Sequence, residues 1–108
     1  MTGRRVSSRP GVLWTELALD DLKRERAYLH RYRPSAAREF AKMTKDAVKT
    51  LTEHPEAGRV HEDLLPVGRY RYLLVNRHQL IYRRDQDMGL VILRLWDARQ
   101  DPSSLALK

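Results

Sequence analysis

Residues 68–96 have the pattern of three consecutive β-strands, and residues 69–75, the first of them, alternate bulky and basic positions. Residues 69–75 include aromatic and β-branched side chains that suit a pleated surface, and the polar residues 76–78 predict a tight turn. Residues 80–83 form the expected return strand, and residues 85–89 a second turn. Residues 90–96 are the most apolar run of the chain. The glycine before this run and its β-branched residues favour a strand over a helix, placed inside the sheet with both faces covered.

The first half of the chain predicts a short strand and a first helix. Residues 11–14 read as a strand at an edge of the sheet, and Thr15 stands where a helix N-cap belongs. The helix is expected to run to about Tyr32 and to end before Pro34, because proline disfavours helical geometry in the residue that precedes it. Apolar residues recur along one side at helical spacing: Ala18, Leu22, Leu29 and Tyr32.

A second amphipathic helix is predicted from Ser35, as its cap, to about His54, with Pro55 as the stop. Its apolar side consists of Ala37, Phe40, Ala41, Thr44, Val48 and Leu51. Residues 56–67 are expected to form a loop. The element order is therefore β-α-α-β-β-β, an α+β domain with a helical hairpin packed on a mostly antiparallel four-stranded sheet. We expect the domain to span residues 11–102, after a flexible basic arm (1–10) and before a short C-terminal tail (103–108). The predicted core is Trp14, Leu22, Phe40, Leu51, Leu74, Ile92 and Leu95.

Composition narrows the classes of function. The 108 residues carry 21 Lys and Arg against 14 Asp and Glu, a formal charge of +7. This charge has two interpretations of about equal weight: an anionic partner, such as RNA, DNA or an acidic protein, or a soluble surface that repels other copies of itself. The chain has no cysteine, which excludes disulfides and thiolate chemistry. It shows neither a signal peptide nor a run long enough to span a membrane, so a cytoplasmic protein without a membrane partner is expected.

Few residues suggest a cofactor or metal site. His61, Glu62 and Asp63 are metal-capable, but consecutive residues rarely converge on one ion, so a solvated loop is the favoured interpretation. No glycine-rich phosphate loop is present, and we expect neither a metal nor a cofactor.

The arginines of the predicted strands carry more information. A shared anion-binding patch is favoured over ordinary solvent exposure for Arg69, Arg71, Arg83, Arg94 and Arg99. Tyr70, Tyr72 and Tyr82 are expected to pack in the core.

The order and spacing of these features resemble the RelE/ParE superfamily, the toxins of type II toxin–antitoxin modules, which include plasmid-stabilisation proteins. The resemblance covers about residues 11–102, and it implies a toxin held inactive by a cognate antitoxin. The matching positions are Val12, Leu13, Trp14, Thr15, Ala18, Asp21 and Leu22; Pro34, Ala36, Ala37 and Phe40; Leu51, Pro55, Gly58 and Arg59; Gly68, Arg69, Tyr70 and Arg71; Leu80, Ile81, Tyr82 and Arg83; Leu93, Arg94 and Leu95; and Arg99, Gln100 and Asp101.

The superfamily has two main branches with different targets. The RelE-like branch cuts mRNA in the ribosome with basic residues and a C-terminal tyrosine or histidine, whereas the ParE-like branch poisons DNA gyrase. Gln79 stands where the nuclease branch has an arginine, and Asp97 where many relatives of both branches have a histidine. Where a catalytic tyrosine would stand, the chain has Ser103, Ser104 and Leu105.

These departures favour gyrase inhibition slightly. The alternative is a ribosome-dependent mRNA endonuclease, in which Arg99 would stabilise the transition state and Arg69 or Arg71 would hold phosphates. Proton transfer would then fall to His78, Glu62 or Asp97, none of them placed by a motif. A third interpretation is a nucleic-acid-binding domain without toxicity. Whether the protein is an enzyme depends on this choice.

Overall fold

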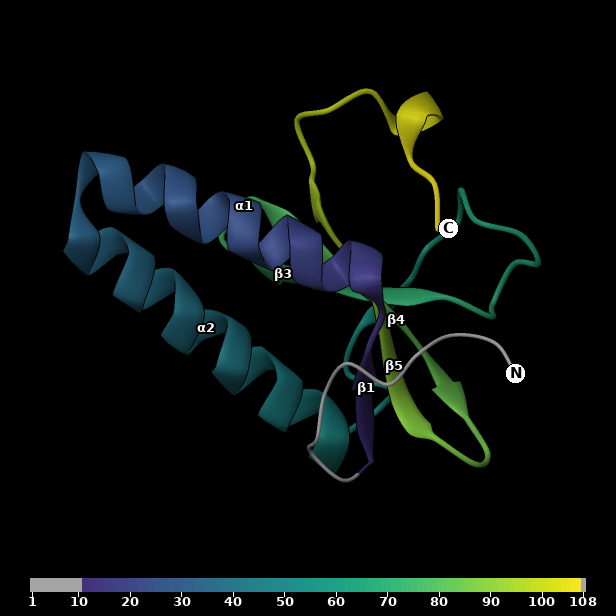
Figure 1. The fold of residues 1–108 in the computed structure, drawn as a ribbon. Helices are drawn as coiled ribbons and strands as arrows, with labels where there is room; N and C mark the ends of the chain where they lie inside the picture. The colour runs from purple at the N-terminus through teal and green to yellow at the C-terminus, as the bar shows by residue number, and fades with distance from the viewer. Residues whose placement is uncertain (1–10, 108) are drawn as a thin grey trace.

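The computed structural model describes residues 11–107; the predicted basic arm lies outside the described residues. Two helices lie against one face of a five-stranded sheet of order β1-β5-β4-β3-β2 (Figure 1). The elements are β1 (Val12–Trp14), α1 (Glu16–Tyr32), α2 (Pro34–Glu53), β2 (Arg59–Val60), β3 (Arg71–Val75), β4 (His78–Asp85), β5 (Gly89–Asp97) and a 3₁₀ turn, η1 (Pro102–Ser104). The α+β prediction is confirmed, and among the described strands only β1 and β5 pair in parallel. None of the described helices is long and apolar enough to cross a membrane.

The prediction of four strands was wrong by one, because the expected loop 56–67 contains β2. Arg59 and Val60 pair with the start of β3, and two residues are too few to produce a recognisable alternation. The Tyr82 hydroxyl holds this segment in place. It donates to the Pro55 carbonyl at 2.6 Å and accepts from the Gly58 amide at 3.0 Å. A Cβ on Gly58 would lie 2.6 Å from that hydroxyl oxygen, so glycine is required there.

The helix boundaries follow the sequence closely. The Thr15 side chain accepts from the Ala18 amide at 3.1 Å, which confirms the predicted N-cap, and it also donates to the Leu93 carbonyl of β5 at 3.0 Å. Arg33 ends α1 and precedes α2, whose first residue is Pro34. Ser35 is therefore inside the helix, and its prediction as the cap was wrong. Proline suits this first helical position because its missing N–H would be unpaired there in any case.

The sheet is covered on both faces. Between helices and sheet lie, among others, Phe40, Leu51, Tyr82, Ile92 and Leu95, with Trp14 and Leu22 packed at the margin. The opposite face, called here the outer face, buries Leu13, Ile81, Val91, Leu93 and Trp96. Partly buried residues of β3, the loops and the tail pack against them, including Tyr72 of β3, Leu64, Tyr70, Leu105 and Leu107. The apolar strand β5 is thus buried on both sides, as predicted.

Two residues of the predicted apolar sets are exposed. Leu74 is 60% exposed. Leu73 takes the helix-facing side of β3, and β2 pairs only with Arg71 and Tyr72, so it ends before Leu74. Tyr32 is 73% exposed, since the free end of the helical hairpin extends beyond the sheet (Figure 1). Both were wrongly predicted as buried.

The edge of β5 is closed by a side chain where β1 stops. β1 pairs with β5 only as far as Ile92. Beyond it, Asp21 of α1 accepts the Leu95 amide at 2.9 Å and the Arg94 side chain at 2.8 and 3.0 Å. Asp21 is 6% exposed, so this bond is shielded from water. The carboxylate therefore replaces the carbonyl that a longer β1 would have supplied.

Candidate functional site

The predicted arginines of β3 and β4 are each engaged locally. Arg71 donates to the Gly58 carbonyl at 2.8 Å and so helps to fix the turn before β2. Arg83 donates to Asp85 at 3.1 Å, and Asp85 also accepts two amides of the turn that follows. These contacts lower the pKa of Asp85, the turn amides being the larger cause. Arg69 is exposed, and its guanidinium lies 5.9 Å from the centre of the Tyr70 ring.

The two arginines at the end of β5 are also paired, at different depths. The Arg94 side chain, 12% exposed, is bound to Asp21 and lies 5.1 Å from the centre of the Trp96 ring. Arg99 is 62% exposed and forms a two-pronged pair with Asp97 at 3.0 and 2.7 Å. The hydrogen bond from Arg99 holds the pKa of Asp97 down to about 2, and the pKa of Arg99 is raised in return. The structure therefore gives four of the five predicted arginines separate hydrogen-bonded partners.

His78 is the first residue of β4 and not part of the turn in which the sequence placed it. The turn prediction itself holds, since Asn76 has the positive φ of 59° that a tight turn requires. The His78 side chain is 7% exposed, its Nε2 lies 3.5 Å from a Glu25 carboxylate oxygen, and its ring packs edge-on against Phe40. Across the sheet it is paired with Asp97. The structure thus gathers His78, Asp97 and Arg99 at one corner but covers the imidazole.

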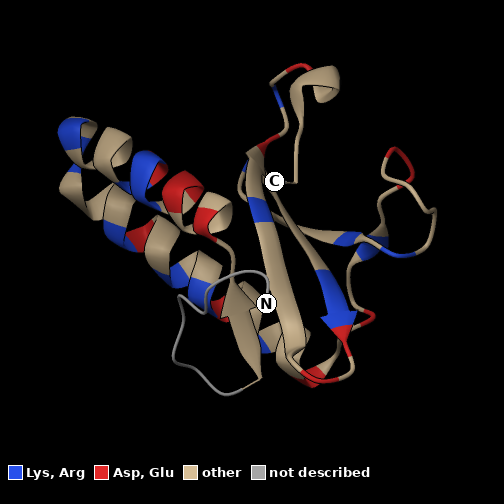
Figure 2. Cartoon of the chain, turned by 45° about the vertical axis from the view of Figure 1, so that its right-hand side comes forward, with Lys and Arg blue, Asp and Glu red and all other residues tan. Residues whose placement is uncertain are grey.

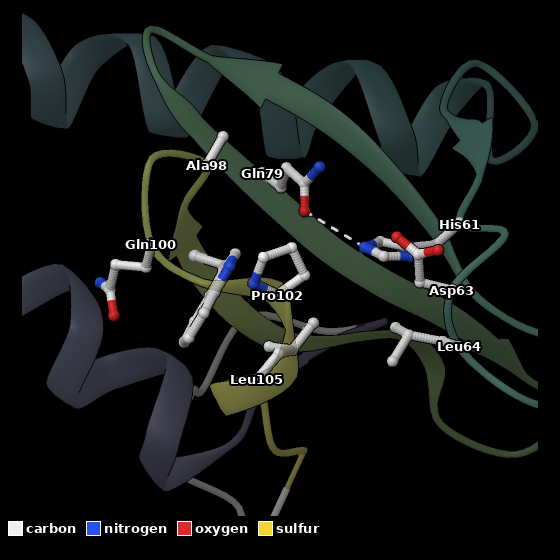
Figure 3. A pocket seen from close by; sticks show the side chains of 9 residues that line it. His61, Asp63, Leu64, Gln79, Ala98, Gln100, Pro102 and Leu105 are labelled. Atoms are coloured by element: carbon white, nitrogen blue, oxygen red, sulfur yellow. Dashed lines mark hydrogen bonds between the residues drawn. The ribbon is translucent and has the colours of Figure 1, made fainter.

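A pocket on the outer face contains His61, a residue that was expected to be exposed to solvent. The cavity measures about 140 Å³ and lies between β4, β5, the loop after β2 and the C-terminal tail (Figure 3). His61, expected in a solvated loop, is 5% exposed; its ring nitrogen lies 3.2 Å from the Gln79 side-chain oxygen. Its amide bonds to Tyr70, which continues the β2–β3 pairing by one residue. No local pattern indicated this burial, because the strand that precedes His61 is too short to be recognised from the sequence.

The pocket is lined by both polar and apolar side chains and carries little positive charge. Its walls are His61, Asp63, Leu64, Gln79, Trp96, Ala98, Gln100, Pro102 and Leu105. The Nδ1 atom of His61 is buried without a hydrogen-bond partner among the described residues. Within residues 11–107 no three metal-capable side chains gather at one point. The pocket can accept a small polar group, but no arginine lines it to hold a phosphate.

Comparisons with known proteins settle the family. A model of the ParE toxin of the type II toxin–antitoxin system parDE matches residues 12–102. The chain belongs to the ParE toxin family. This ParE-family toxin is 43% identical over 49 residues to Toxin RelE2 of Caulobacter vibrioides, a match that covers 45% of this chain and 56% of that protein. The chain thus spans about half the length of the curated relative that it matches.

A solved structure supports the fold of the toxin. The chromosomal ParDE toxin–antitoxin system from P. aeruginosa contains a chain that superimposes with a TM-score of 0.68 over 86% of this chain and 100% of that one. The sequence identity is 20%, so this likeness concerns the fold alone. The resemblance to the RelE/ParE superfamily predicted from the sequence is confirmed by the family match.

Proposed function

We propose that this toxin inhibits DNA gyrase and does not cut RNA. The observation that carries the proposal is the two-pronged pair between Arg99 and Asp97, at 3.0 and 2.7 Å. RNA cleavage through the 2′-hydroxyl develops charge on a crowded phosphate, which free cationic donors must stabilise. Arg99 is the basic position that a nuclease would use for this purpose, and here its charge is offset by its neighbour. The pair occupies Nε and Nη2, so a phosphate would have to displace the carboxylate to use this face of the guanidinium.

The geometry around His78 supports the same proposal. A general base must reach the proton that it removes, within hydrogen-bond distance or through one water. The His78 side chain is 7% exposed beneath Glu25 and Phe40, so a phosphate backbone cannot approach its nitrogens without moving α1. Gln79, at the position of a nuclease arginine, is neutral and is bound to His61.

We infer that a cognate antitoxin neutralises the toxin through an acidic segment, and that the contacted arginines are Arg69, Arg71, Arg83, Arg94 and Arg99. Arg69 and Arg99 are the exposed members of this set. Reversing the charge of both, Arg69→Glu with Arg99→Glu, is expected to slow association with the antitoxin at low salt, because charges at the rim of an interface act mainly on encounter. An unchanged association rate would show that these arginines lie outside the interface.

Since gyrase acts on the chromosome, we place the active toxin in the cytoplasm.

The target is tested by two assays on the same purified toxin. Supercoiling of relaxed plasmid by gyrase is expected to fall with added toxin, and primer extension on translating mRNA is expected to give no new ends. Arg99→Ala and His78→Ala are then compared for growth arrest, with antitoxin binding measured separately. If mRNA cuts appear and Arg99→Ala loses about 10²–10³ in rate, the typical cost of one transition-state donor, the toxin is an endonuclease and the proposal fails.

A further inference from the structure

Two large aromatic side chains stand uncovered at the free end of the helical hairpin. Tyr28 is 44% exposed and Tyr32 is 73% exposed, although both belong to the well-formed second half of α1. Their rings meet edge to face, with centres 5.0 Å apart and planes at 69°. The Tyr32 hydroxyl raises the pKa of Tyr28, as expected for two phenols in contact. The pair therefore forms one preassembled aromatic feature.

The surroundings of this pair are strongly basic. Residues 23–33 contain Lys23, Arg24, Arg26, Arg31 and Arg33 against the single acid Glu25, a net charge of 5 − 1 = +4 out of the +7 of the whole chain. Basic positions mark the helical hairpin towards its free end (Figure 2). The charge and the tyrosines thus share α1 from Lys23 onwards and the residue that follows it.

Helix stability accounts for only part of this pattern. Cations near a helix C-terminus interact favourably with the helix dipole, typically by about 0.3–1 kcal/mol each, and the effect is confined to the last turn. It explains Arg31 but gives no reason for an exposed pair of tyrosines. Tyrosine and arginine together are the composition of binding hot spots, where an aromatic anchor fills a pocket on the partner and surrounding charges orient it.

The shape of this end decides which partner it fits. The hairpin extends beyond the sheet (Figure 1), and Tyr28 and Tyr32 belong to the last turns of α1, where the hairpin projects. A projection needs a concave receptor, which a folded protein surface provides and a single antitoxin segment lying along a groove does not. We propose that Tyr28 and Tyr32 are the point at which this toxin docks onto its target, inserted into an acidic pocket of a folded protein. The proposal rests on the proposed function in taking the target to be a protein, gyrase.

The experiment uses the full chain with Tyr28→Ala and Tyr32→Ala combined. Alanine favours the helix and both positions are exposed, so the fold is expected to survive; circular dichroism and the melting temperature check this. Met43→Ala is the matched control, since Met43 is likewise an exposed apolar side chain on a helix, at 43%. Tyr28→Phe with Tyr32→Phe keeps the rings and removes the hydroxyls. Each variant is measured for growth arrest, gyrase supercoiling, antitoxin affinity and binding to a labelled DNA duplex.

The double alanine variant is expected to need at least about thirtyfold more protein for half-inhibition of gyrase, which is the lower limit of the loss at a hot spot. Its antitoxin affinity and DNA binding should match those of the Met43→Ala control, and the phenylalanine variant should keep most of its activity. Growth arrest and gyrase inhibition equal to the parent would overturn the proposal. So would a loss explained by weaker antitoxin or DNA binding, which would identify a different partner class.

The two proposals fail in different ways. If the parent cuts mRNA and leaves supercoiling intact, the gyrase proposal fails on the parent alone, whatever the variants do. Growth arrest then still reports on docking, because it does not depend on which target is struck. Arrest lost in the double alanine variant would uphold the docking surface for another target, and arrest retained would overturn it.

Discussion

Replacing Asp21 by alanine is the most informative test of how this fold is held together. The carboxylate is almost fully buried and accepts from the Arg94 side chain twice and from the Leu95 amide once. Asp21→Ala therefore leaves a cation that is 12% exposed, and a buried backbone N–H, without their acceptor. The same change removes the tie between α1 and the uncovered part of β5.

The expected magnitude is large for a single substitution. Breaking a buried ion pair from one side costs about 3–5 kcal/mol, because the remaining charge stays desolvated. Arg94 keeps its bond to the Ala106 carbonyl and its contact with Trp96, which places the estimate towards the lower end, about 3–4 kcal/mol. A domain of this size has about 5–15 kcal/mol in total, so the melting temperature should fall by on the order of 12 °C or more.

Urea unfolding followed by tryptophan fluorescence measures this loss. Asp21→Asn keeps an acceptor for the Leu95 amide and should be less damaging, while Asp20→Ala, at an exposed neighbouring position, should stay within about 0.5 kcal/mol of the parent. Asp21→Ala combined with Arg94→Met removes the stranded cation, so a coupling of about 1–3 kcal/mol is expected. A loss below about 1 kcal/mol for Asp21→Ala, or strict additivity in the double variant, would refute the reasoning.

Three further outcomes are expected. Phe40→Ala should lower the free energy of unfolding in urea by about 3–5 kcal/mol, because it empties a buried site, whereas Met43→Ala on the exposed side should change it little. Tyr82→Phe should cost about 1–3 kcal/mol in the same assay, since it removes one hydroxyl that pairs with two backbone groups; a neutral result would mean that water replaces it. The pKa of Asp97 is lower in the folded state than its ordinary value of 3.8, so the stability that its pair with Arg99 contributes is complete above pH 3.8 and is lost as pH falls towards about 2. Arg99→Ala should therefore flatten the dependence of stability on pH in that window, and an unchanged profile would contradict the pairing.

Most of the fold could be predicted because its signals are local. Thr15 caps α1, Pro34 separates the helices and Asn76 turns the chain, and each acts through its own backbone or that of its neighbours. The apolar run of β5 was recognisable because both faces of that strand are covered. In each case the physical cause lies within a few residues of the signal.

The remaining features depend on contacts between distant parts of the chain. β2 exists because Arg59 and Val60 meet β3, and His61 is buried because the same pairing carries it onto the outer face. Tyr32 continues the periodicity of α1, and its exposure follows from where the sheet ends. The arginines could be recognised as candidate anion-binding residues, but the sequence could not show that Arg94 and Arg99 each have a carboxylate partner.

The pairing of β1 with β5 has a consequence for when the fold can be completed during synthesis. Thr15 and Leu93, joined by a hydrogen bond, are 78 positions apart, so the sheet cannot close until the chain has been synthesised beyond residue 93. At typical rates of about 5–20 residues per second, the helical hairpin therefore waits several seconds with its apolar side uncovered. During this interval the nascent chain lacks its finished sheet. Under the proposed function, a cognate antitoxin that is already present can bind the chain in this interval, before it is able to reach its target.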